Sequence, residues 1–235
     1  MMIAHELREV VCRANQALAG TGLVFGTFGN VSGADVAAGV FVIKPSGVPY
    51  EELTAAHMVP VSLETGAALE STFRPSSDTA THLELYRAFR CGGIVHTHSE
   101  SATILAQARM PLRCMGTTHA DYFRGEVPVT RPMRSDEVTS DYERNTGLVI
   151  VETFHLAAVS PDQVTAVLVA NHGPFVWAAD PSEAVERARV LEFLARMEIG
   201  MRLVAPDAPR PDAHLVDKHY FRKHGQAAYY GQKRR

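Results

Sequence analysis

Residues 92–99 read Gly-Gly-Ile-Val-His-Thr-His-Ser, and this stretch decides how the rest of the chain is interpreted. Two apolar β-branched residues lead into His96 and His98, and Ser99 precedes a helix-like run at residues 102–108. Because alternate side chains of a strand point the same way, both histidines are expected to leave one face at a strand end. Two neutral imidazoles on one face form part of a typical zinc site. The pattern alone fits two unrelated, half-buried histidines equally well.

A third histidine follows another run of strand type. Residues 164–170 are rich in β-branched residues, and they are followed by Asn171-His172-Gly173. His172 is therefore expected at a strand end beside a glycine turn, where it could converge with His96 and His98. A single histidine in such a place is more often structural. With the upstream pair present, we interpret it as a metal ligand.

Composition indicates an ordinary α/β globular domain. The chain has 235 residues, 46% of them hydrophobic and 21% charged, which fits one domain. A net charge of -3 gives no reason to expect a nucleic-acid partner. Three cysteines without paired spacing favour a reducing compartment. The chain shows neither a signal-peptide core nor a long apolar segment, so a soluble, cytoplasmic protein without a membrane partner is expected.

Three turns of small and polar residues are candidates for binding phosphate. They are the glycine-rich residues 26–33, residues 44–47 (Lys-Pro-Ser-Gly) and residues 76–78 (Ser-Ser-Asp). Glycine lets backbone N–H groups approach an anion closely, and a helix N-terminus also favours one. Each turn taken alone is more simply a loop or a helix cap. Asp78 likewise has a plain explanation as a partner of the helix dipole.

Periodicity predicts the remaining elements. Helices are expected at residues 7–18, 82–89 and 136–144, strands at 39–44, 58–63 and 147–153, and a hairpin strand at 67–70. Residues 180–183 (Asp-Pro-Ser-Glu) form a helix start, and prolines at 206, 209 and 211 predict a linker. The aromatic and basic residues 214–235 alone would indicate a solvated end or a weak RNA contact.

Taken together, these stretches resemble the class II aldolase/adducin family, and within it the L-ribulose-5-phosphate 4-epimerase branch. The matching pieces cover nearly the whole chain in order: residues 29–32, 41–47, 75–78, 92–99, 116–123, 171–177 and 217–232. The tail, with Lys-His-Tyr-Phe-Arg-Lys-His-Gly at 218–225 and Ala-Tyr-Tyr-Gly-Gln at 228–232, is the most discriminating piece. Phe28 departs from the pattern, in which Trp is common at that position.

The resemblance implies a three-layer α/β/α fold with a central, mainly antiparallel sheet. It implies a catalytic domain at 1–205 and a tail at 206–235 that completes the active site of a neighbouring subunit in a homotetramer. It also implies one divalent metal, usually Zn2+ with Mn2+ or Co2+ as substitutes, and no nucleotide cofactor. The implied metal residues are His96, His98 and His172, with Asp78 at or beside the metal. The implied substrate-binding residues are Gly29, Asn30, Lys44, Ser46, Gly47, Ser76 and Ser77, with supporting roles for His219 and Glu143. Asp121 and Tyr230 match the acid/base pair.

The implied reaction interconverts L-ribulose 5-phosphate and D-xylulose 5-phosphate. The hydrogen on C4 is not α to the C2 carbonyl, so its removal would give no stabilised carbanion. The C4 hydroxyl is β to that carbonyl, so the C3–C4 bond can instead break by a retro-aldol step and re-form on the other face. A sugar-phosphate aldolase of the L-fuculose-1-phosphate type is the nearest alternative, and Asp78 and the tail weigh against it. A non-catalytic, adducin-like interaction module is a more distant one.

Overall fold

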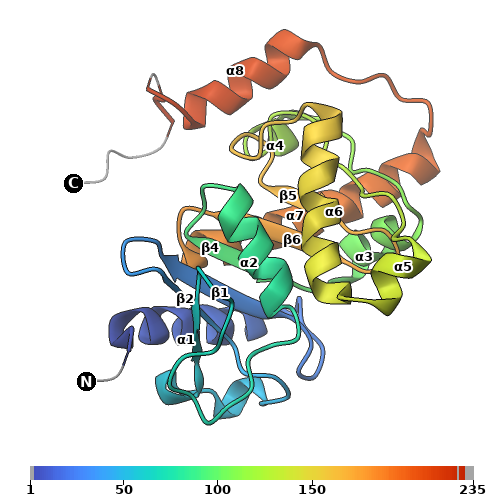
Figure 1. The fold of residues 1–235 in the computed structure, drawn as a ribbon. Coiled ribbons are helices and arrows are strands. Elements are labelled where there is room, and N and C mark those ends of the chain that lie inside the picture. Colours follow the sequence, from blue (N-terminus) through green and yellow to red (C-terminus); the bar gives the residue numbers. More distant parts are fainter. Residues whose placement is uncertain (1–2, 227, 231–235) are drawn as a thin grey trace.

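The computed structural model describes residues 3–226 and 228–230, and its centre is a six-stranded sheet (Figure 1). The strand order is β3-β2-β1-β4-β6-β5, and every neighbouring pair is antiparallel. The strands are β1 (Asn30–Asp35), β2 (Val40–Ile43), β3 (Val59–Ser62), β4 (Gly93–His96), β5 (Ala166–Leu168) and β6 (Pro174–Ala178). The expected antiparallel sheet is therefore confirmed, with the histidine strand β4 near its middle.

Helices cover both faces of this sheet. They are α1 (His5–Ala19), α2 (Thr79–Ala88), α3 (Glu100–Gln107), α4 (Thr117–Ala120), α5 (Ser135–Thr139), α6 (Tyr142–Ala157), α7 (Pro181–Val204) and α8 (Ala213–Lys223), with 3-10 turns η1 (Tyr50–Glu52) and η2 (Ala55–His57). Neighbouring residues of β1 show the layering, because successive side chains of a strand point to opposite faces. Ser32 bonds to His82 of α2, whereas a side chain at Gly33 would meet Val11 of α1 and Pro181 of α7. The fold is thus a three-layer α/β/α arrangement.

The two glycines of residues 92–99 let helix α7 approach the sheet. A Cβ atom at Gly93 would collide with the backbone of Asp180 and Pro181, where α7 begins. That helix starts as expected, with the Asp180 side chain accepting a hydrogen bond from the Glu183 N–H at 2.8 Å. The glycines are therefore required by the contact between β4 and α7 and not by a turn.

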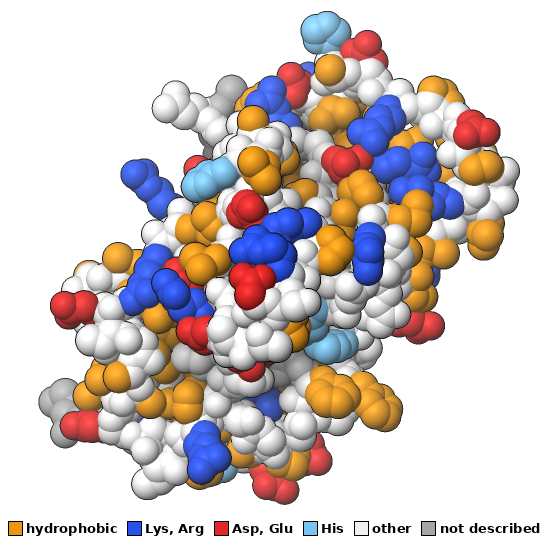
Figure 2. Space-filling model, turned by 45° about the vertical axis from the view of Figure 1, so that its right-hand side comes forward, with side chains coloured by type: hydrophobic (Ala, Val, Ile, Leu, Met, Phe, Trp, Pro, Cys, Tyr) orange, Lys and Arg blue, Asp and Glu red, His pale blue; other side chains and the backbone are white. Residues whose placement is uncertain are grey.

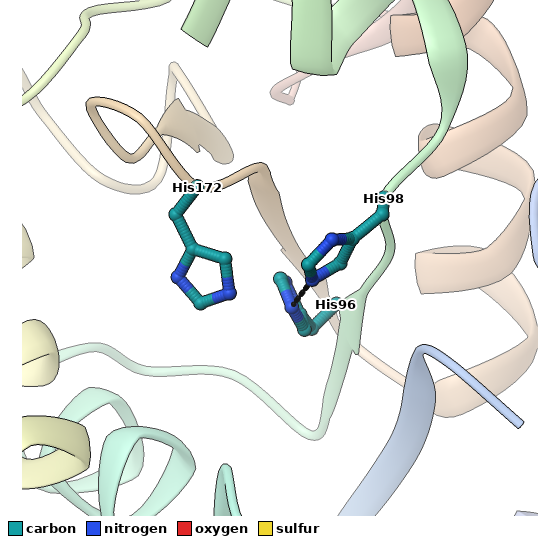
Figure 3. Close-up of side chains that lie close together, drawn as sticks. All are labelled: His96, His98 and His172. Carbon is teal, nitrogen blue, oxygen red and sulfur yellow. Dashed lines mark hydrogen bonds between the residues drawn. The ribbon is translucent and has the colours of Figure 1, made fainter. Parts of the chain in front are cut away.

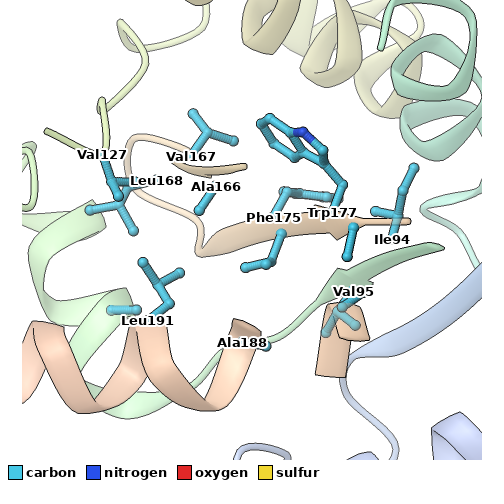
Figure 4. Packing of buried hydrophobic residues seen from close by; sticks show 14 of the residues in the cluster. Ile94, Val95, Val127, Ala166, Val167, Leu168, Phe175, Trp177, Ala188 and Leu191 are labelled. Atoms are coloured by element: carbon cyan, nitrogen blue, oxygen red, sulfur yellow. The ribbon is translucent and has the colours of Figure 1, made fainter. Parts of the chain in front are cut away.

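The core lies between the sheet and its helices, as Figure 4 shows for the residues around β4 and β6. Trp177 is almost fully buried, with its ring 4.8 Å from Phe89 and 5.3 Å from Phe154. Its indole N–H donates to the Pro161 carbonyl at 2.9 Å, so the polar atom of the largest core residue is satisfied. A rigid core thus lies directly behind the strand that ends in His96.

The predicted strand at residues 147–153 is wrong, because this stretch lies inside helix α6. Its β-branched residues suggest a strand, but the buried residues of α6 are Thr146, Gly147, Val149, Ile150 and Phe154, which recur at helical spacing. A short apolar run fits either structure, and here packing against α2 decides for the helix.

Other boundaries also differ from the expectations. Residues 26–33 are only partly a loop, because β1 begins at Asn30, and the hairpin at 67–70 is a single bridge between Val61 and Ala68. Helix α2 begins at Thr79, so Asp78 occupies the N-cap position and not the first turn. The Asp78 N–H donates to the Ser76 hydroxyl at 3.3 Å, which holds Asp78 outside the helix.

The chain after α7 runs through the proline-rich linker and returns as α8, which packs beside α4 (Figure 1). Residues 227 and 231–235, which include the end of the tail motif, lie outside the described residues. None of the helices within the described residues has the length and apolar character needed to cross a membrane. On the face seen in Figure 2, side chains of both charges are mixed with scattered hydrophobic ones.

Candidate active site

Three histidine rings approach one space from different sides (Figure 3). His96 ends β4, His98 follows two residues later, and His172 comes from the turn before β6. One nitrogen of each ring lies within 4.8 Å of the others, and His96 Nε2 is 3.1 Å from His98 Nε2. Two nitrogen lone pairs at this distance repel each other unless a proton or a cation lies between them. The triad predicted from the sequence is therefore assembled in space.

The His96 ring is fixed from behind by the neighbouring strand. Its Nδ1 donates to the Pro174 carbonyl at 2.9 Å, which leaves the Nε2 lone pair facing the other two histidines. A metal-binding histidine commonly has its second ring nitrogen held in this way. The triad thus fits a divalent metal with three nitrogen ligands and open coordination positions.

A tight turn presents His172. The Val169 N–H donates to the Gly173 carbonyl at 2.9 Å, and the His172 N–H donates to the Val169 carbonyl at 3.0 Å. Asn171 takes a φ of 62°, in the left-handed region that asparagine tolerates better than most residues. Gly173 is pressed against the neighbouring chain segment, because a Cβ there would lie 2.7 Å from the Thr97 carbonyl oxygen. These constraints bring His172 to the end of β4.

Burial favours the neutral form of two of these imidazoles, those of His98 and His172. It lowers the pKa of His172 to about 3, with further lowering by His96 and His98. Burial followed by the proximity of His96 also lowers the pKa of His98. The neutral imidazole is the form that binds a metal.

Asp78 lies beside the triad. Its carboxylate accepts a hydrogen bond at 2.7 Å from the Asn30 side-chain amide, which also donates to the Ser76 hydroxyl at 3.1 Å. Burial raises the pKa of Asp78, but His96, His82 and the Asn30 amide outweigh it and leave the pKa below its ordinary value. The nitrogen atoms of the triad form their close group without Asp78. Its direct coordination of a metal stays a prediction.

The triad and the candidate phosphate turns line one cavity of about 370 Å³. It brings together twelve of the residues expected from the sequence: Gly29, Asn30, Lys44, Ser46, Gly47, Ser76, Ser77, Asp78, His96, His98, Glu143 and His172. These residues come from β1, the loop after β2, the start of α2, the end of β4, the start of α6 and the turn before β6. Segments far apart in the sequence thus meet at one end of the sheet.

The part of the cavity lined by Gly29, residues 44–47 and residues 76–77, here called the anion cradle, suits an anion. Gly29 and Gly47 have φ values of 81° and 70°, in the left-handed region that favours glycine. Lys44 is buried, and its ammonium donates to the Val48 carbonyl at 3.0 Å. Burial lowers the pKa of Lys44 to about 8. No carboxylate of the described residues lies within ion-pair distance of Lys44, so the cavity contains a cationic group without a counterion.

Comparison with known proteins identifies the fold family. Residues 9–199 match the family model described as Class II Aldolase and Adducin N-terminal domain. The chain belongs to this class II aldolase family. Structures similar to it include an L-fuculose 1-phosphate aldolase at 24% identity, with a TM-score of 0.77 and coverage of 92% of this chain and 97% of that one.

Two further similar structures share slightly more sequence. YgbL from Klebsiella pneumoniae, a putative aldolase/epimerase/decarboxylase, is 27% identical with a TM-score of 0.71, and the match covers 93% of this chain and 99% of that one. The L-fuculose-1-phosphate aldolase from Thermus thermophilus is 26% identical with a TM-score of 0.64, and the match covers 87% of this chain and 98% of that one. The expected family is therefore confirmed, at the level of a class II aldolase.

The remaining predicted site residues, Asp121, His219 and Tyr230, form a second cluster outside the lining of the cavity. Asp121, at the end of α4, accepts hydrogen bonds from Arg222 at 2.9 and 2.6 Å and from His219 at 3.1 Å, and Lys223 lies 3.6 Å from it. The Arg222 guanidinium lies 4.7 Å from the centre of the Tyr230 ring. Among the described residues lining the cavity, Asp121, His219 and Tyr230 are absent.

The charges in this second cluster keep Asp121 ionised. Burial raises the pKa of Asp121, but hydrogen bonds from Arg222 and His219 and the charge of Lys223 outweigh it and leave the pKa below its ordinary value. The predicted acid/base pair, Asp121 and Tyr230, thus shares two cations, Arg222 and Lys223, on the α4–α8 side of its own chain.

The sequence did not single out two further parts of this candidate site. Tyr142 lines the cavity, and its only signal was its place next to Glu143. Behind Asp78, the Ser32 hydroxyl lies 2.7 Å from both His82 Nδ1 and the Tyr86 hydroxyl. His82 lies four residues after Asp78, on the same side of the helix, so helical spacing could have indicated it. Burial lowers the pKa of His82 to about 3.

Proposed function

We propose that this chain is a metal-dependent enzyme that breaks and re-forms a carbon–carbon bond of a sugar phosphate, with L-ribulose-5-phosphate 4-epimerase as its activity. The observation that carries the proposal is one cavity that combines three converging histidines with an anion cradle containing a lysine without a carboxylate partner among the described residues. Membership of the class II aldolase family supports the reaction type. The Asp121–Tyr230 cluster and the tail motif support the epimerase outcome.

His96, His98 and His172 would hold the metal, with Zn2+ proposed and Mn2+ or Co2+ as substitutes. When bound, the metal would act as a Lewis acid towards oxygens of the ketose near the bond to be broken. The chain's own groups supply the rest. The serine hydroxyls and glycine N–H groups of the cradle, with Lys44, would hold the phosphate of the two-carbon fragment. This grip is needed because a released fragment would make the enzyme an aldolase.

Proton transfer at the C4 hydroxyl requires one group on each face of the fragment. We assign these roles to Asp121 and Tyr230. An ionised Asp121 has no proton to give in its resting state, so it would accept the hydroxyl proton, and Tyr230 would donate on the other face. His219 and Glu143 are proposed as supporting residues, the former on Asp121 and the latter in the cavity wall.

This assignment requires a second subunit. The cluster is held on the α4–α8 side of the chain, whereas the cavity is lined by other elements. We therefore propose that residues 1–205 form the catalytic domain and that residues 206–235 complete the site of a neighbouring subunit in a homotetramer. In this arrangement Asp121 and the tail that contacts it belong to the same neighbouring subunit, so both proton carriers come from that neighbour.

A sugar-phosphate aldolase is the second candidate, and the 26% identity to the Thermus L-fuculose-1-phosphate aldolase favours it. It would use the same cavity and break the same kind of bond. Incubation of the protein with L-ribulose 5-phosphate distinguishes the two activities. We expect D-xylulose 5-phosphate to form without free glycolaldehyde phosphate. Accumulation of the free aldehyde would favour the aldolase.

Metal analysis tests whether the chain is an enzyme of this type at all. We expect the purified protein to contain about one divalent metal per chain, because the triad offers one site. A protein that neither contains nor binds a metal stoichiometrically, and that turns over neither substrate, would favour the adducin-like interaction module.

A further inference from the structure

We propose that Tyr50 is a positioning residue of the anion cradle, which it holds from behind by joining the Gly29 loop to Lys44. The proposal rests on the proposed function, because it assigns a support to the phosphate side of that site. Tyr50 lies in the turn η1 and is only 5% exposed. Its side chain is absent from the described residues that line the cavity, so it would act through its two neighbours.

The first contact is made by the Tyr50 hydroxyl. It lies 2.8 Å from the Gly29 carbonyl oxygen and 3.1 Å from that of Phe28, and its single proton is shared between these acceptors. Burial raises the pKa of Tyr50, so the hydroxyl remains a donor throughout the working pH range. The donor thus fixes two successive peptide groups just before β1 begins.

This contact determines where the Gly29 N–H points. In a trans peptide the carbonyl and the following N–H point in opposite directions. Since the Phe28 carbonyl faces Tyr50, the Gly29 N–H is directed away from Tyr50, and no described residue accepts a hydrogen bond from it. Gly29 itself lines the cavity. The free N–H is therefore available to an anion, such as the phosphate group of a sugar phosphate or inorganic phosphate.

Residue 29 has no room for a side chain. A Cβ atom there would lie 2.9 Å from the His96 carbonyl oxygen and 3.5 Å from the Tyr50 hydroxyl. The loop thus fits closely between Tyr50 on one side and the strand that carries the metal ligand on the other. Any rotation of the Phe28 or Gly29 peptide would break the contact with Tyr50.

The second contact is made by the Tyr50 ring. The Lys44 ammonium lies 4.7 Å from its centre and also donates to the Val48 carbonyl. A cation over an aromatic face is attracted to it, most strongly where water is excluded. Lys44 has no carboxylate within ion-pair distance among the described residues, so its ammonium is held by this ring and by the carbonyls of Val48 and, at 3.4 Å, Pro45. One side chain therefore sets the spacing between the two anion-binding groups.

Two substitutions separate the contacts. Tyr50→Phe removes only the hydroxyl and keeps the ring beneath Lys44, whereas Tyr50→Leu removes both. Thr153→Val is the control, because the Thr153 hydroxyl also donates to a backbone carbonyl, that of Val149 at 2.8 Å, and Thr153 is absent from the described residues that line the cavity. Titration calorimetry with inorganic phosphate, hydrogen exchange of residues 27–31 without ligand, and thermal unfolding are measured for each protein.

We expect Tyr50→Phe to weaken phosphate binding by about 3- to 10-fold, the effect of losing one hydrogen bond, and to speed exchange in residues 27–31. The pH midpoint of phosphate binding should stay unchanged in this variant, because the ring remains. In Tyr50→Leu binding should fall by more than tenfold and the pH midpoint should move. Thr153→Val should alter phosphate affinity by less than twofold.

The proposed function and the proposed role of Tyr50 can be contradicted separately. A wild-type protein that binds no phosphate at millimolar concentration would contradict the proposed function and remove the premise for Tyr50. If the wild type binds phosphate but Tyr50→Phe matches it in both affinity and exchange of residues 27–31, the proposed role of Tyr50 is wrong. The same holds if Thr153→Val weakens binding as much as Tyr50→Phe does.

Discussion

At the scale of single residues, Lys44 is the group whose charge the fold leaves uncompensated. Burial lowers its pKa from 10.5 to about 8. Between these pH values the unfolded chain holds a proton that the folded chain lacks, so this group makes the free energy of unfolding rise with pH. Phosphate binding should change in the opposite direction, because the neutral amine no longer attracts the anion. We expect affinity for inorganic phosphate to decrease above about pH 8 while the free protein becomes more stable through this residue.

Lys44→Met isolates these effects. Calorimetry and denaturant unfolding are compared for the wild type and the variant at a series of pH values from 7 to 10. The difference between the two proteins should show both trends, since all other titrating groups are shared. A difference in phosphate affinity that does not vary with pH would contradict a titrating Lys44 in the cradle.

The histidine triad leads to a second prediction at this scale. His172→Ala should release most of the metal on dialysis, because the two remaining histidine ligands bind a metal more weakly than three. The fold should persist, since His172 lies in a turn and not in the core. Metal content is measured by elemental analysis and folding by circular dichroism. His155→Ala, at an exposed position of α6, is the control and should keep its metal. Full metal occupancy in His172→Ala would exclude it as a ligand.

Residues whose positions depend on local geometry were the easiest to predict from the sequence. His96 and His98, and the Lys-Pro-Ser-Gly turn at 44–47, are each recognisable within a few residues, because local geometry directs their side chains. Asp121 was named only through the family resemblance, which gave no indication of its surroundings. Its main partner, Arg222, is 101 residues away, and no local pattern indicates such a pairing. The positions of chemical groups could thus be predicted, whereas the charges that surround them required the tertiary structure.

At the scale of elements, the packing of α2 against α6 explains why the predicted strand at 147–153 is a helix. Gly147 allows the two helices to approach closely, because a Cβ atom there would lie 2.8 Å from the Glu84 Cβ and 3.1 Å from the Thr81 carbonyl oxygen. The Thr81 hydroxyl in turn donates to the Glu143 carbonyl at 2.5 Å. This contact places the first turn of α6, with Tyr142 and Glu143, in the cavity wall. Residue composition could not reveal it, since it depends on a partner more than 60 residues earlier.

Substitutions at two glycines test whether close packing of α2 against α6 requires Gly147. Gly147→Ala should lower the free energy of unfolding by about 1–3 kcal/mol, because overpacking outweighs the better helix propensity of alanine. Gly200→Ala in α7 is the matched control, since a Cβ atom there would meet nothing within 4 Å. It should raise the free energy of unfolding by about 0.5–1 kcal/mol. Both values are measured by denaturant titration. Stabilisation by Gly147→Ala would mean that α2 and α6 are not in close contact there.

At the scale of the whole molecule, the groups needed for the proposed reaction are divided between two regions. The cavity at the end of the sheet holds the triad and the anion cradle, and the α4–α8 cluster holds Asp121, His219 and Tyr230. Arg222 links Asp121 to Tyr230 within one chain. From the sequence, only the tail was expected to act in a neighbouring subunit. The structure extends this expectation, because Asp121 lies with the tail and should accompany it.

Mixed oligomers test this division of labour. His98→Ala removes the function of the cavity, and Asp121→Asn removes that of the cluster, so each variant alone should lose most of its activity. After subunit exchange, the intact cavity of an Asp121→Asn subunit can meet the intact cluster of a His98→Ala subunit. Random mixing of equal amounts makes about a quarter of the sites complete, and epimerase activity should return to about that level.

The pair Asp121→Asn and Tyr230→Phe is the decisive comparison. Because these residues belong to the same cluster, each cluster in the mixture still lacks one proton carrier, and the activity should stay as low as in the parents. Exchange itself is verified with a mass-tagged subunit and native mass spectrometry. Recovery in this second mixture would show that Asp121 acts within its own chain and Tyr230 in the neighbour. No recovery in the first mixture, with exchange demonstrated, would mean that His98 and Asp121 work in the same chain. An active monomer would exclude any shared site.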